Sequence, residues 1–591
     1  MRSLKPLIAT CAVLGLILIP VTGASAAPSG SGSSDDNVMR LPMTGSEIDS
    51  LNPFLATFQA SLDILNMEYD SLARQGLPDR AIVPSLAKGW KVDGNTWTYM
   101  LRPGLKWSDG KPLTAEDIAW TYTQVMTNPK LAVANGSIVA NVESVKAVNA
   151  TKFQLVTKEP TAVNPGQLPI VPRHIWSKIV SPDKYTNLTK VVGSGPFILT
   201  KYGRTTSATM KANANYWRGK PKLDALVFVN YKNTDAAVLA LRSGEIDMVS
   251  GMNAAQYKAL GSVKGITRVQ VPSQHYWDLS INPGATALDD KPIGTGAPAL
   301  QDPVFRNAIR QALDTKKLVD KVLGGYGSTG PEIMAPGSKT YYWDDKSVVQ
   351  PYSPEEANRK LDAAGYTKSA DGYRVDKTGK TIDLKLAFNA SDTPNTTTAS
   401  FIQPWLKEIG IKVTLNPTNW DEMSADALKG TYDMYINGWG IQADPDFMLF
   451  INTCATRPTD ASGANNATSD NWCDPEFDAL YKKQHAETDQ AKRVELVHKA
   501  LAVHYKAAVA NILYYDDSLE AYRSSRITGL TPMSGDVNNY WALGNAKVIG
   551  GNSDGGGGLG WVFGIIGAVA VAGVIVWVVV ARRRRGSDTR E

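Results

Sequence analysis

Apolar and polar residues alternate along the chain in short runs that predict strands followed by helices. An apolar strand at 224–231 is followed by a helical pattern at 235–243, and a helical pattern at 401–409 is followed, after Gly410, by a strand of β-branched residues at 411–415. A glycine often ends a helix, and strands that alternate with helices are typical of α/β layers. The pattern therefore predicts an α/β body.

Further helices are predicted where a capping residue or proline precedes an amphipathic run. Thr114 stands before one such run, and short strands fill 82–107 ahead of it. The other predicted helices are 302–313, 318–323 and 355–364. No short-period repeat interrupts this order.

The first 26 residues have the pattern of a secretory signal peptide. Two basic residues precede an apolar run at 7–19, Pro20 ends that run, and Ala24-Ser25-Ala26 fits a cleavage site. The alternative is an uncleaved N-terminal anchor. The Ser/Gly-rich stretch that follows predicts a disordered leader at 27–37.

A second apolar run predicts a C-terminal transmembrane helix at 559–581. Its 23 uncharged residues would span about 34 Å as a helix, against a hydrocarbon core of roughly 30 Å. Four arginines follow, and basic clusters favour the cytoplasmic side. The sequence predicts a single-pass protein of the cell membrane, with a Gly-rich tether at 549–558, an extracytoplasmic body and a cytoplasmic tail at 582–591. A nuclear-localisation or RNA-binding role for the arginines is the alternative.

The basic excess is confined to these two ends. Of 62 basic and 57 acidic residues in the chain, 55 and 54 belong to residues 27–553. A neutral body argues against a broad phosphate-binding face, so no nucleic acid is expected as a partner. With 591 residues, 43% of them hydrophobic, the chain has room for roughly two to four folded units.

Two cysteines remain once Cys11 is removed with the signal peptide. Cys454 and Cys473 form an even pair, with 18 residues between them and no His or further Cys in that stretch. In an exported protein this predicts a disulfide. A metal site is the alternative, and it would need more ligands nearby.

Motifs of catalysis are incomplete. Thr378-Gly379-Lys380-Thr381 resembles the end of a phosphate-binding loop, but Arg374 stands where that motif needs glycine. A G-x-S-x-G match at 551–555 lies in the tether, with no strand before it. The five histidines form no zinc-binding motif. The sequence predicts no enzyme activity, no metal and no cofactor.

Residues 82–117 carry a longer and more specific pattern. It runs from Ile82-Val83-Pro84-Ser85-Leu86-Ala87-Lys88-Gly89-Trp90 through Thr96-Trp97-Thr98-Tyr99 to Asp109-Gly110-Lys111-Pro112-Leu113-Thr114-Ala115-Glu116-Asp117. This pattern resembles the signature of the family 5 extracellular solute-binding proteins, the dipeptide- and oligopeptide-binding components of ABC importers. Further matches follow in the family's order over about residues 38–548, among them Gly193–Phe197, Asn215–Trp217, Ser243–Asp247, Asp302–Ile309, Ile409–Val413, Tyr432–Met434 and Asp474–Asp478.

The resemblance implies a two-lobed α/β fold of the periplasmic-binding-protein type (type II, cluster C) with an extra domain. By analogy, lobe I takes 38–70, 190–285 and 520–548, the extra domain takes 71–189, and lobe II takes 286–519. The implied partners are a peptide or other small solute, an ABC permease and its ATPase, and the membrane through the C-terminal helix. We expect a monomer.

The resemblance also implies where ligand binds. Family contacts concentrate after Leu51-Asn52-Pro53, near the strand at Tyr276-Trp277 and between residues 420 and 439. The candidate ligand-binding residues are Thr57, Gln59, Trp277, Trp420, Gly438, Trp439 and Asp444.

Two of these residues keep a spacing of peptide-binding members, in which one tryptophan precedes the next by nineteen residues. Trp420 and Trp439 have this interval, and Trp439 follows Gly438 just beyond a strand predicted at 432–436. Aromatic faces suit a site that must hold varied side chains. For each tryptophan, burial in the core is the alternative.

The same region departs from the peptide pattern. Peptide-binding members place an aspartate for the ligand's ammonium three residues after the second tryptophan, where this chain has Gln442; the nearest acid is Asp444. Positions that carry basic residues for the ligand carboxylate in some members hold Ala427 and Ile436. A buried ammonium without a carboxylate would be costly, so an oligosaccharide, another amide or a modified peptide is an alternative ligand.

Three functions compete at this point. The first is a binding protein that delivers a peptide-like solute to an ABC importer. The second is a surface sensor or envelope-assembly factor on the same scaffold, without transport. The third, a secreted hydrolase, lacks a set of nucleophile and base.

Overall fold

A computed structural model describes residues 37–44, 48–464, 468 and 470–549. The described residues belong to one compact unit. The predicted signal peptide, the leader up to residue 36, the tether beyond residue 549, the helix at 559–581 and the basic tail lie outside the described residues. The division of the body into two lobes and an extra domain remains a prediction, so the three main sheets are named here A, B and C.

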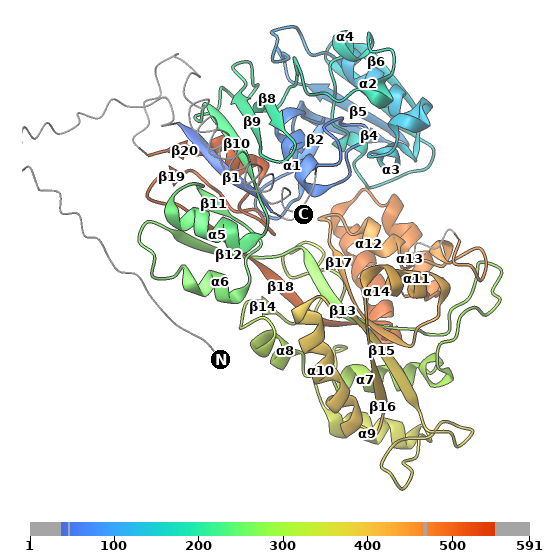
Figure 1. Ribbon diagram of the computed structural model, residues 1–591. Coiled ribbons are helices and arrows are strands. Elements are labelled where there is room, and N and C mark those ends of the chain that lie inside the picture. The colour runs from blue at the N-terminus through green and yellow to red at the C-terminus, as the bar shows by residue number, and fades with distance from the viewer. Residues whose placement is uncertain (1–36, 45–47, 465–467, 469, 550–591) are drawn as a thin grey trace, which may run out of the picture. The chain divides into compact units, whose positions relative to one another are not determined.

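Sheet A joins the beginning of the described chain to strands from much later in the sequence. Its order is β1 (Val38–Thr44), β10 (Ala225–Tyr231), β9 (Ser207–Ala212) and β8 (Phe197–Gly203). β1 and β10 are parallel neighbours (Figure 1). The helices nearby are α1 (Gln59–Glu68), α5 (Thr234–Ser243), α6 (Ala254–Ala259) and α15 (Tyr540–Asn545). Leu41, Ile64 and Leu543 belong to one hydrophobic cluster, so both ends of the body share a core.

The predicted glycine stop after α5 is confirmed and has a steric reason. Gly244 has a φ of 87°, and the Arg523 guanidinium would lie 2.3 Å from any Cβ placed there. Only glycine meets both demands without strain.

Sheet B is antiparallel and belongs to the segment of the family signature. Its order is β4 (Ala87–Asp93), β5 (Thr96–Leu101), β7 (Lys152–Thr157) and β6 (Val142–Asn149). The helix predicted after Thr114 is confirmed as α2 (Ala115–Thr127), where the Thr114 amide donates to Asp117 in a capping box. Smaller elements here are β2 (Ala73–Gln75), β3 (Ile82–Pro84), α3 (Gly136–Val139) and α4 (Arg173–Trp176).

Sheet C has eight strands and mixes parallel with antiparallel pairs. Its main order is β11 (Met248–Val249), β18 (Ala510–Tyr522), β13 (His275–Ile281), β17 (Met434–Gly440), β15 (Asp383–Asn389) and β16 (Lys412–Thr418), with β12 (Thr267–Pro272) and β14 (Gly327–Ser328) also paired to β18. β15 is parallel to both β16 and β17, whereas β13 is antiparallel to β17. A separate pair is formed by β19 (Ile527–Thr528) and β20 (Lys547–Val548).

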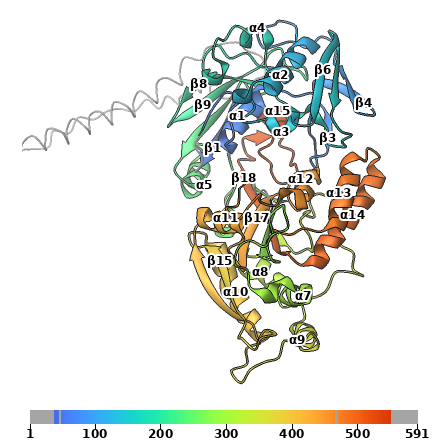
Figure 2. The ribbon, with the colours of Figure 1, turned by 90° about the vertical axis from the view of Figure 1, so that its right-hand side faces the viewer.

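Helices cover both faces of sheet C (Figure 2). One face has a core that includes Leu279, Leu386 and Ile436, under α7 (Pro303–Gln311), α8 (Thr315–Lys321), α9 (Pro354–Ala363) and α10 (Thr393–Glu408). The other face has α11 (Trp420–Lys429), α12 (Asp446–Phe450), α13 (Pro475–Ala486) and α14 (Gln490–Ala507). Helix α10 begins at Thr393, earlier than residue 401, because the Asp392 carboxylate caps a polar first turn that lacks an apolar period.

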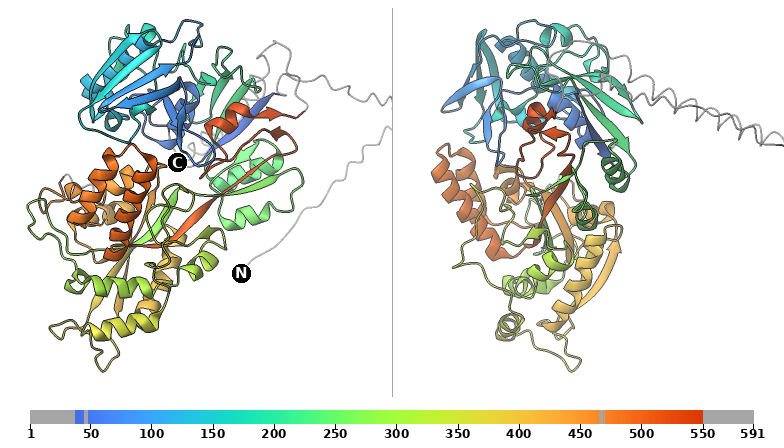
Figure 3. Two further views of the ribbon diagram at one scale, coloured as in Figure 1. Left: turned by 180° about the vertical axis from the view of Figure 1, so that it is seen from behind. Right: turned by 90° about the vertical axis from the view of Figure 1, so that its left-hand side faces the viewer.

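Strand β18 links the two groups of strands within sheet C (Figure 1 and Figure 3). Its residues 517–522 pair with β12, its residues 515 and 516 pair with β14, and its residues 510–514 pair with β13.

The side chain of Gln274, between β12 and β13, forms two hydrogen bonds. Its Nε2 donates to Ser534 Oγ at 2.6 Å, and its Oε1 accepts from Ser338 Oγ at 2.9 Å.

Cys454 and Cys473 are joined by a disulfide, with a Cα–Cα distance of 4.5 Å. The Cys454 amide also donates to Asp478 at 3.0 Å, so the bridge ties the segment after α12 to the first turn of α13.

The prediction of a membrane-spanning helix requires a correction. Among the helices of the described residues, none is long and apolar enough to cross a membrane. These residues therefore give no support to a fold class with a C-terminal transmembrane helix, to a partnership with the membrane through that helix, or to a single-pass localisation with a cytoplasmic C-terminus; the run predicted to form that helix, 559–581, lies outside them. What stands is the α/β body with its three sheets.

Candidate functional site

The candidate site begins at one edge of sheet C. The parallel strands β15, β16 and β17 end here at Asn389, Thr418 and Gly440, and antiparallel β13 begins here at His275. Ligands of α/β proteins commonly bind beyond the carboxyl ends of parallel strands, where loops can present varied side chains.

Three aromatic rings form a row at this edge. The His275 and Trp277 ring centroids are 5.1 Å apart, and those of Trp277 and Trp420 are 5.9 Å apart. Trp420 is 40% exposed although it is a large apolar side chain. We call His275, Trp277 and Trp420 the aromatic edge.

Gly438 completes the aromatic edge by lacking a side chain. It pairs directly with Trp277, and a Cβ placed on it would lie 2.8 Å from His275 Cε1 and 3.0 Å from Trp277 Cε3. Any larger residue would displace a ring. The structure thus brings together three of the candidate residues, Trp277, Trp420 and Gly438.

Trp439 lies on the opposite face of sheet C. It pairs with Tyr276, whose side chain is fully buried, and it packs against the same hydrophobic cluster. Its other aromatic neighbour is Phe447, at 6.3 Å between centroids. The strand prediction that ended at residue 436 was too short, because β17 continues to Gly440 and turns Trp439 away from Trp420.

Asp444 is held by a basic residue of α14. Its two carboxylate oxygens accept from the guanidinium of Arg493 at 2.7 Å each. Burial by itself would lower the pKa of Arg493, but the hydrogen bonds and charge of Asp444 outweigh it and raise that pKa. This carboxylate is therefore already neutralised by a buried partner, and its two oxygens are both engaged.

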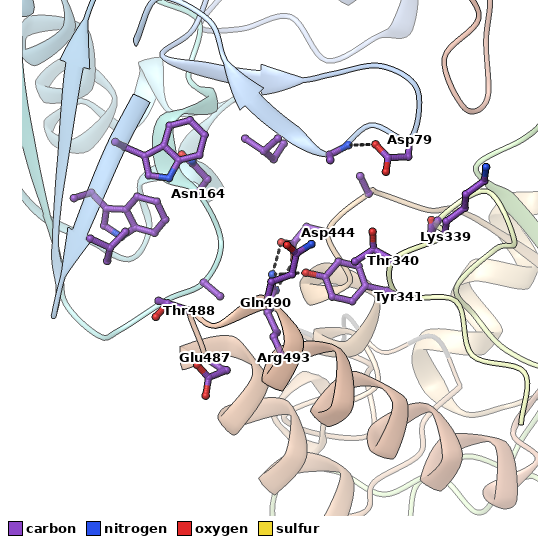
Figure 4. A pocket seen from close by; sticks show the side chains of 18 residues that line it. Asp79, Asn164, Lys339, Thr340, Tyr341, Asp444, Glu487, Thr488, Gln490 and Arg493 are labelled. Atoms are coloured by element: carbon purple, nitrogen blue, oxygen red, sulfur yellow. Dashed lines mark hydrogen bonds and ion pairs between the residues drawn. The ribbon is translucent and has the colours of Figure 1, made fainter. Parts of the chain in front are cut away.

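A cleft of about 430 Å³ lies beside this ion pair (Figure 4). Sheet B and its neighbouring loops contribute Asp79, Trp90, Trp97 and Asn164 to one wall. The opposite wall includes Lys339, Tyr341, Asp444, Glu487, Gln490 and Arg493. Ser338 also lines this cleft and donates to Gln274, the residue before His275, so one hydrogen bond links the lining of the cleft to the start of β13.

The two walls touch directly at one point. The Ala162 amide donates to the carbonyl oxygen of His485 at 2.6 Å.

The imidazole of His485 bonds to Asp446 at 2.7 Å, and this hydrogen bond raises the pKa of His485. The Asp444-Pro445-Asp446 segment is thus fastened by α13 and α14 at both acids.

Sequence reasoning did not single out Trp90, Trp97 or Tyr341 as lining a cleft. The two tryptophans belong to the family signature, which gave a reason to examine them, but the pattern of one segment does not reveal which distant segment faces it. Tyr341 lies in an irregular stretch with no periodicity to interpret.

Thr57 and Gln59 have local roles beside sheet A. The amide and hydroxyl of Thr57 both donate to Asp49 at 2.8 Å. Burial would raise the pKa of Asp49, but hydrogen bonds from Ser61 and Thr57 lower it to about 2. Gln59 donates to Asp63 at 2.6 Å, and both line a separate cavity of about 270 Å³. Among the described residues, no hydrogen bond joins either side chain to the aromatic edge.

In the part of the chain that the structure describes, no group of three or more His, Cys, Asp or Glu side chains could hold a metal ion.

The family model described as bacterial extracellular solute-binding proteins, family 5 Middle, matches residues 81–460. The chain belongs to this family. The match confirms the family resemblance of the signature at 82–117.

Individual relatives agree with the family in sequence and in fold. The dipeptide-binding protein of Escherichia coli K12 is 26% identical over 504 residues, which cover 80% of this chain and 89% of the relative. The substrate-binding protein CtaP of Listeria monocytogenes has a TM-score of 0.72 at 23% identity, over 86% of this chain and 99% of that one. The oligopeptide-binding protein AppA of Bacillus subtilis, in complex with a nonapeptide, has a TM-score of 0.65 at 22% identity, over 87% and 99%. These structures show a two-lobed α/β solute-binding fold.

Proposed function

We propose that this chain captures a peptide or peptide-like solute at the aromatic edge and the cleft linked to it, and delivers it to an ABC importer. The proposal is carried by one observation in particular. In a chain of a solute-binding family, an exposed Trp420 packs against Trp277 at the carboxyl ends of three parallel strands. Exposed aromatic faces at such an edge suit ligands with varied side chains.

Charges on the cleft walls support a zwitterionic ligand. Besides the closed pair of Asp444 and Arg493, the walls carry Asp79, Glu487 and Lys339. Within the described residues, none of these three belongs to an ion pair. Opposite charges on facing walls complement the two termini of a peptide.

The carboxylate that we propose for a ligand ammonium at the aromatic edge is Asp516 rather than Asp444. Asp516 Oδ1 is 3.4 Å from His275 Nδ1, and its side chain is 37% exposed. It thus stands beside the aromatic row on the crossing strand β18, whereas Asp444 is occupied by Arg493.

The proposal is tested by titrating the purified protein with trialanine, N-acetyl-trialanine and maltotriose, following tryptophan fluorescence. We expect trialanine to bind, and Trp420→Ala to weaken it by about 1–2 kcal/mol, as aromatic contacts are worth at ligand interfaces. Tyr352→Ala is the matched control, since Tyr352 is 46% exposed and does not belong to the aromatic edge or line the cleft.

Native mass spectrometry of the freshly purified protein adds an independent measurement, because a co-purified solute would give its mass directly. Binding of maltotriose but of neither peptide would exclude the peptide proposal and favour an oligosaccharide. Equal affinities of the Trp420→Ala and Tyr352→Ala variants would remove the aromatic edge from the site.

A further inference from the structure

A groove beside sheet A gathers positive charge in a body that is otherwise neutral. The groove has a volume of about 330 Å³ and is lined by four basic residues, Arg218, Lys220, Lys222 and Lys547. No aspartate or glutamate is among its lining residues. Since residues 27–553 carry 55 basic and 54 acidic side chains, four cations around one space are a local segregation of charge.

The cations come from two distant parts of the chain. Three follow β9 in the loop 216–222, and the fourth lies on β20 near the end of the described residues. The fold therefore assembles the groove, which one short basic stretch could not form alone.

Aromatic side chains form the wall and fix one of the cations. The Arg218 guanidinium lies over the ring of Trp541, 4.3 Å from its centroid. Trp541 is itself anchored, because its indole nitrogen donates to the Gln75 carbonyl at 2.8 Å. A guanidinium that lies over an aromatic ring can keep N–H donors available at its rim.

The acids around the groove leave most of this charge uncompensated. Lys220 is 3.5 Å from Asp224, and both side chains are 57% exposed. Asp70 lies behind the wall, where Tyr540 and Trp217 donate to it. In the described part of the chain, Arg218, Lys222 and Lys547 take part in no ion pair.

We propose that this groove binds a phosphate group, as an anionic ligand distinct from the solute of the cleft. Phosphate has oxygens on every side and accepts hydrogen bonds from several cations at once, and arginine matches its geometry with two parallel donors. The phosphate can belong to a soluble compound or to the headgroup of an anionic lipid, which present the same chemistry to these side chains.

The test compares three forms of the full chain at low ionic strength, where exposed charges are least screened. They are the wild type, the double variant Lys222→Gln/Lys547→Gln, and the control Lys377→Gln/Lys407→Gln. The control removes the same charge from exposed lysines outside the groove. Calorimetric titration with inorganic phosphate should show binding that the groove variant weakens roughly three- to thirtyfold and the control leaves unchanged.

A second arm identifies the source of the phosphate. Each form is floated with vesicles of phosphatidylcholine alone and with vesicles that contain phosphatidylglycerol. Flotation that needs phosphatidylglycerol and falls in the groove variant assigns a lipid headgroup, whereas phosphate binding without such flotation assigns a soluble ligand. The proposal is overturned if neither probe distinguishes the groove variant from the control. Solute binding at the cleft is measured separately and has no influence on this outcome.

Discussion

Trp420 and Trp439 differ in what their side chains contact, so replacing Trp420 should affect ligand binding and replacing Trp439 should affect stability. Trp420 is 40% exposed, whereas Trp439 packs against Tyr276 and Phe447 on the other face of sheet C. We expect Trp439→Ala to lower the free energy of unfolding by about 2–4 kcal/mol through a cavity, and Trp420→Ala to change it by less than about 1 kcal/mol. Urea unfolding followed by circular dichroism measures both.

The control for this comparison is Trp439→Phe, which keeps most of the buried ring and should recover most of the lost stability. If Trp439→Ala unfolds like the wild type but loses trialanine binding, Trp439 is a ligand contact and its assignment to the core is wrong.

Asp444 and Asp516 are both acids near the candidate site, but they have different partners. Asp444→Asn breaks a bidentate pair and leaves the Arg493 guanidinium buried without its counter-charge. We expect this change to cost about 2–4 kcal/mol of stability, as removal of one partner of a buried pair does. Asp516→Asn serves as the matched control, with little loss because its side chain is partly exposed.

The affinity for trialanine should respond in the opposite order, with a larger loss in Asp516→Asn than in Asp444→Asn. Asp516→Asn should weaken trialanine more than N-acetyl-trialanine, because only the first has an ammonium group. Calorimetric titration of both peptides onto both variants gives the comparison. A selective loss for trialanine in Asp444→Asn, with none in Asp516→Asn, would return the ammonium site to Asp444.

Only part of this site could be predicted from the sequence. The spacing of Trp420 and Trp439 is visible in the sequence, but the face that Trp439 occupies depends on whether β17 continues through it, because side chains alternate between the two faces only within a strand. The pair of Asp444 and Arg493 joins residues 49 apart. Such a contact depends on the packing of α14 against the loop after β17, which no local pattern encodes.

At the scale of elements, the disulfide fastens the loop between α12 and α13. We expect Cys454→Ser to lower the free energy of unfolding by roughly 3 kcal/mol, since the bridge limits the unfolded chain over a sequence separation of 19. Thermal unfolding with and without reductant measures this. Reduction should destabilise the wild type and leave the variant unchanged, whereas two free thiols in the native protein would contradict the bridge.

Elements with a local signal were predictable, and those without one were not. The helix after Thr114 has a capping box within four residues, and α5 ends at a glycine of positive φ. The early part of α10 gave no such signal because its first turn is polar and rich in threonine. Pairings such as β1 with β10 follow from the overall topology and not from either segment alone.

At the scale of the whole molecule, buried acids make stability depend on pH. Burial raises the pKa of Glu68 to about 8, of Asp278 to about 7 and of Asp63 to about 6. Burial and the charge of Asp536 raise that of Glu520 to about 7. At a pH between the ordinary pKa and the raised pKa, each of these carboxyls is protonated in the folded protein and ionised in the unfolded chain.

The sign follows from linkage. A carboxyl whose folded pKa is raised contributes stability that is complete below its unfolded pKa and is lost as pH rises through the folded value. We therefore expect the melting temperature to fall between pH 5 and pH 8, measured by differential scanning calorimetry. Glu68→Gln should flatten this fall, whereas the exposed Glu143→Gln should not. A melting temperature that rises over this range would contradict the assignment.

Strand β18 also determines when the chain can finish folding. Sheet C cannot join β12 to β13 until residues 510–522 are present, and the core beside sheet A includes Ile527 and Leu543 from still later in the chain. Contacts of such long sequence separation form slowly, because a large loop must close before they contribute. A nascent chain that stops before residue 510 would hold sheet C without β18, so that the edge of β13 that pairs with β18 stays open. Because β18 is synthesised after β12 and β13, these two strands cannot join one sheet until residues 510–522 have been made. Any protein that must bind the unfinished chain can do so before then.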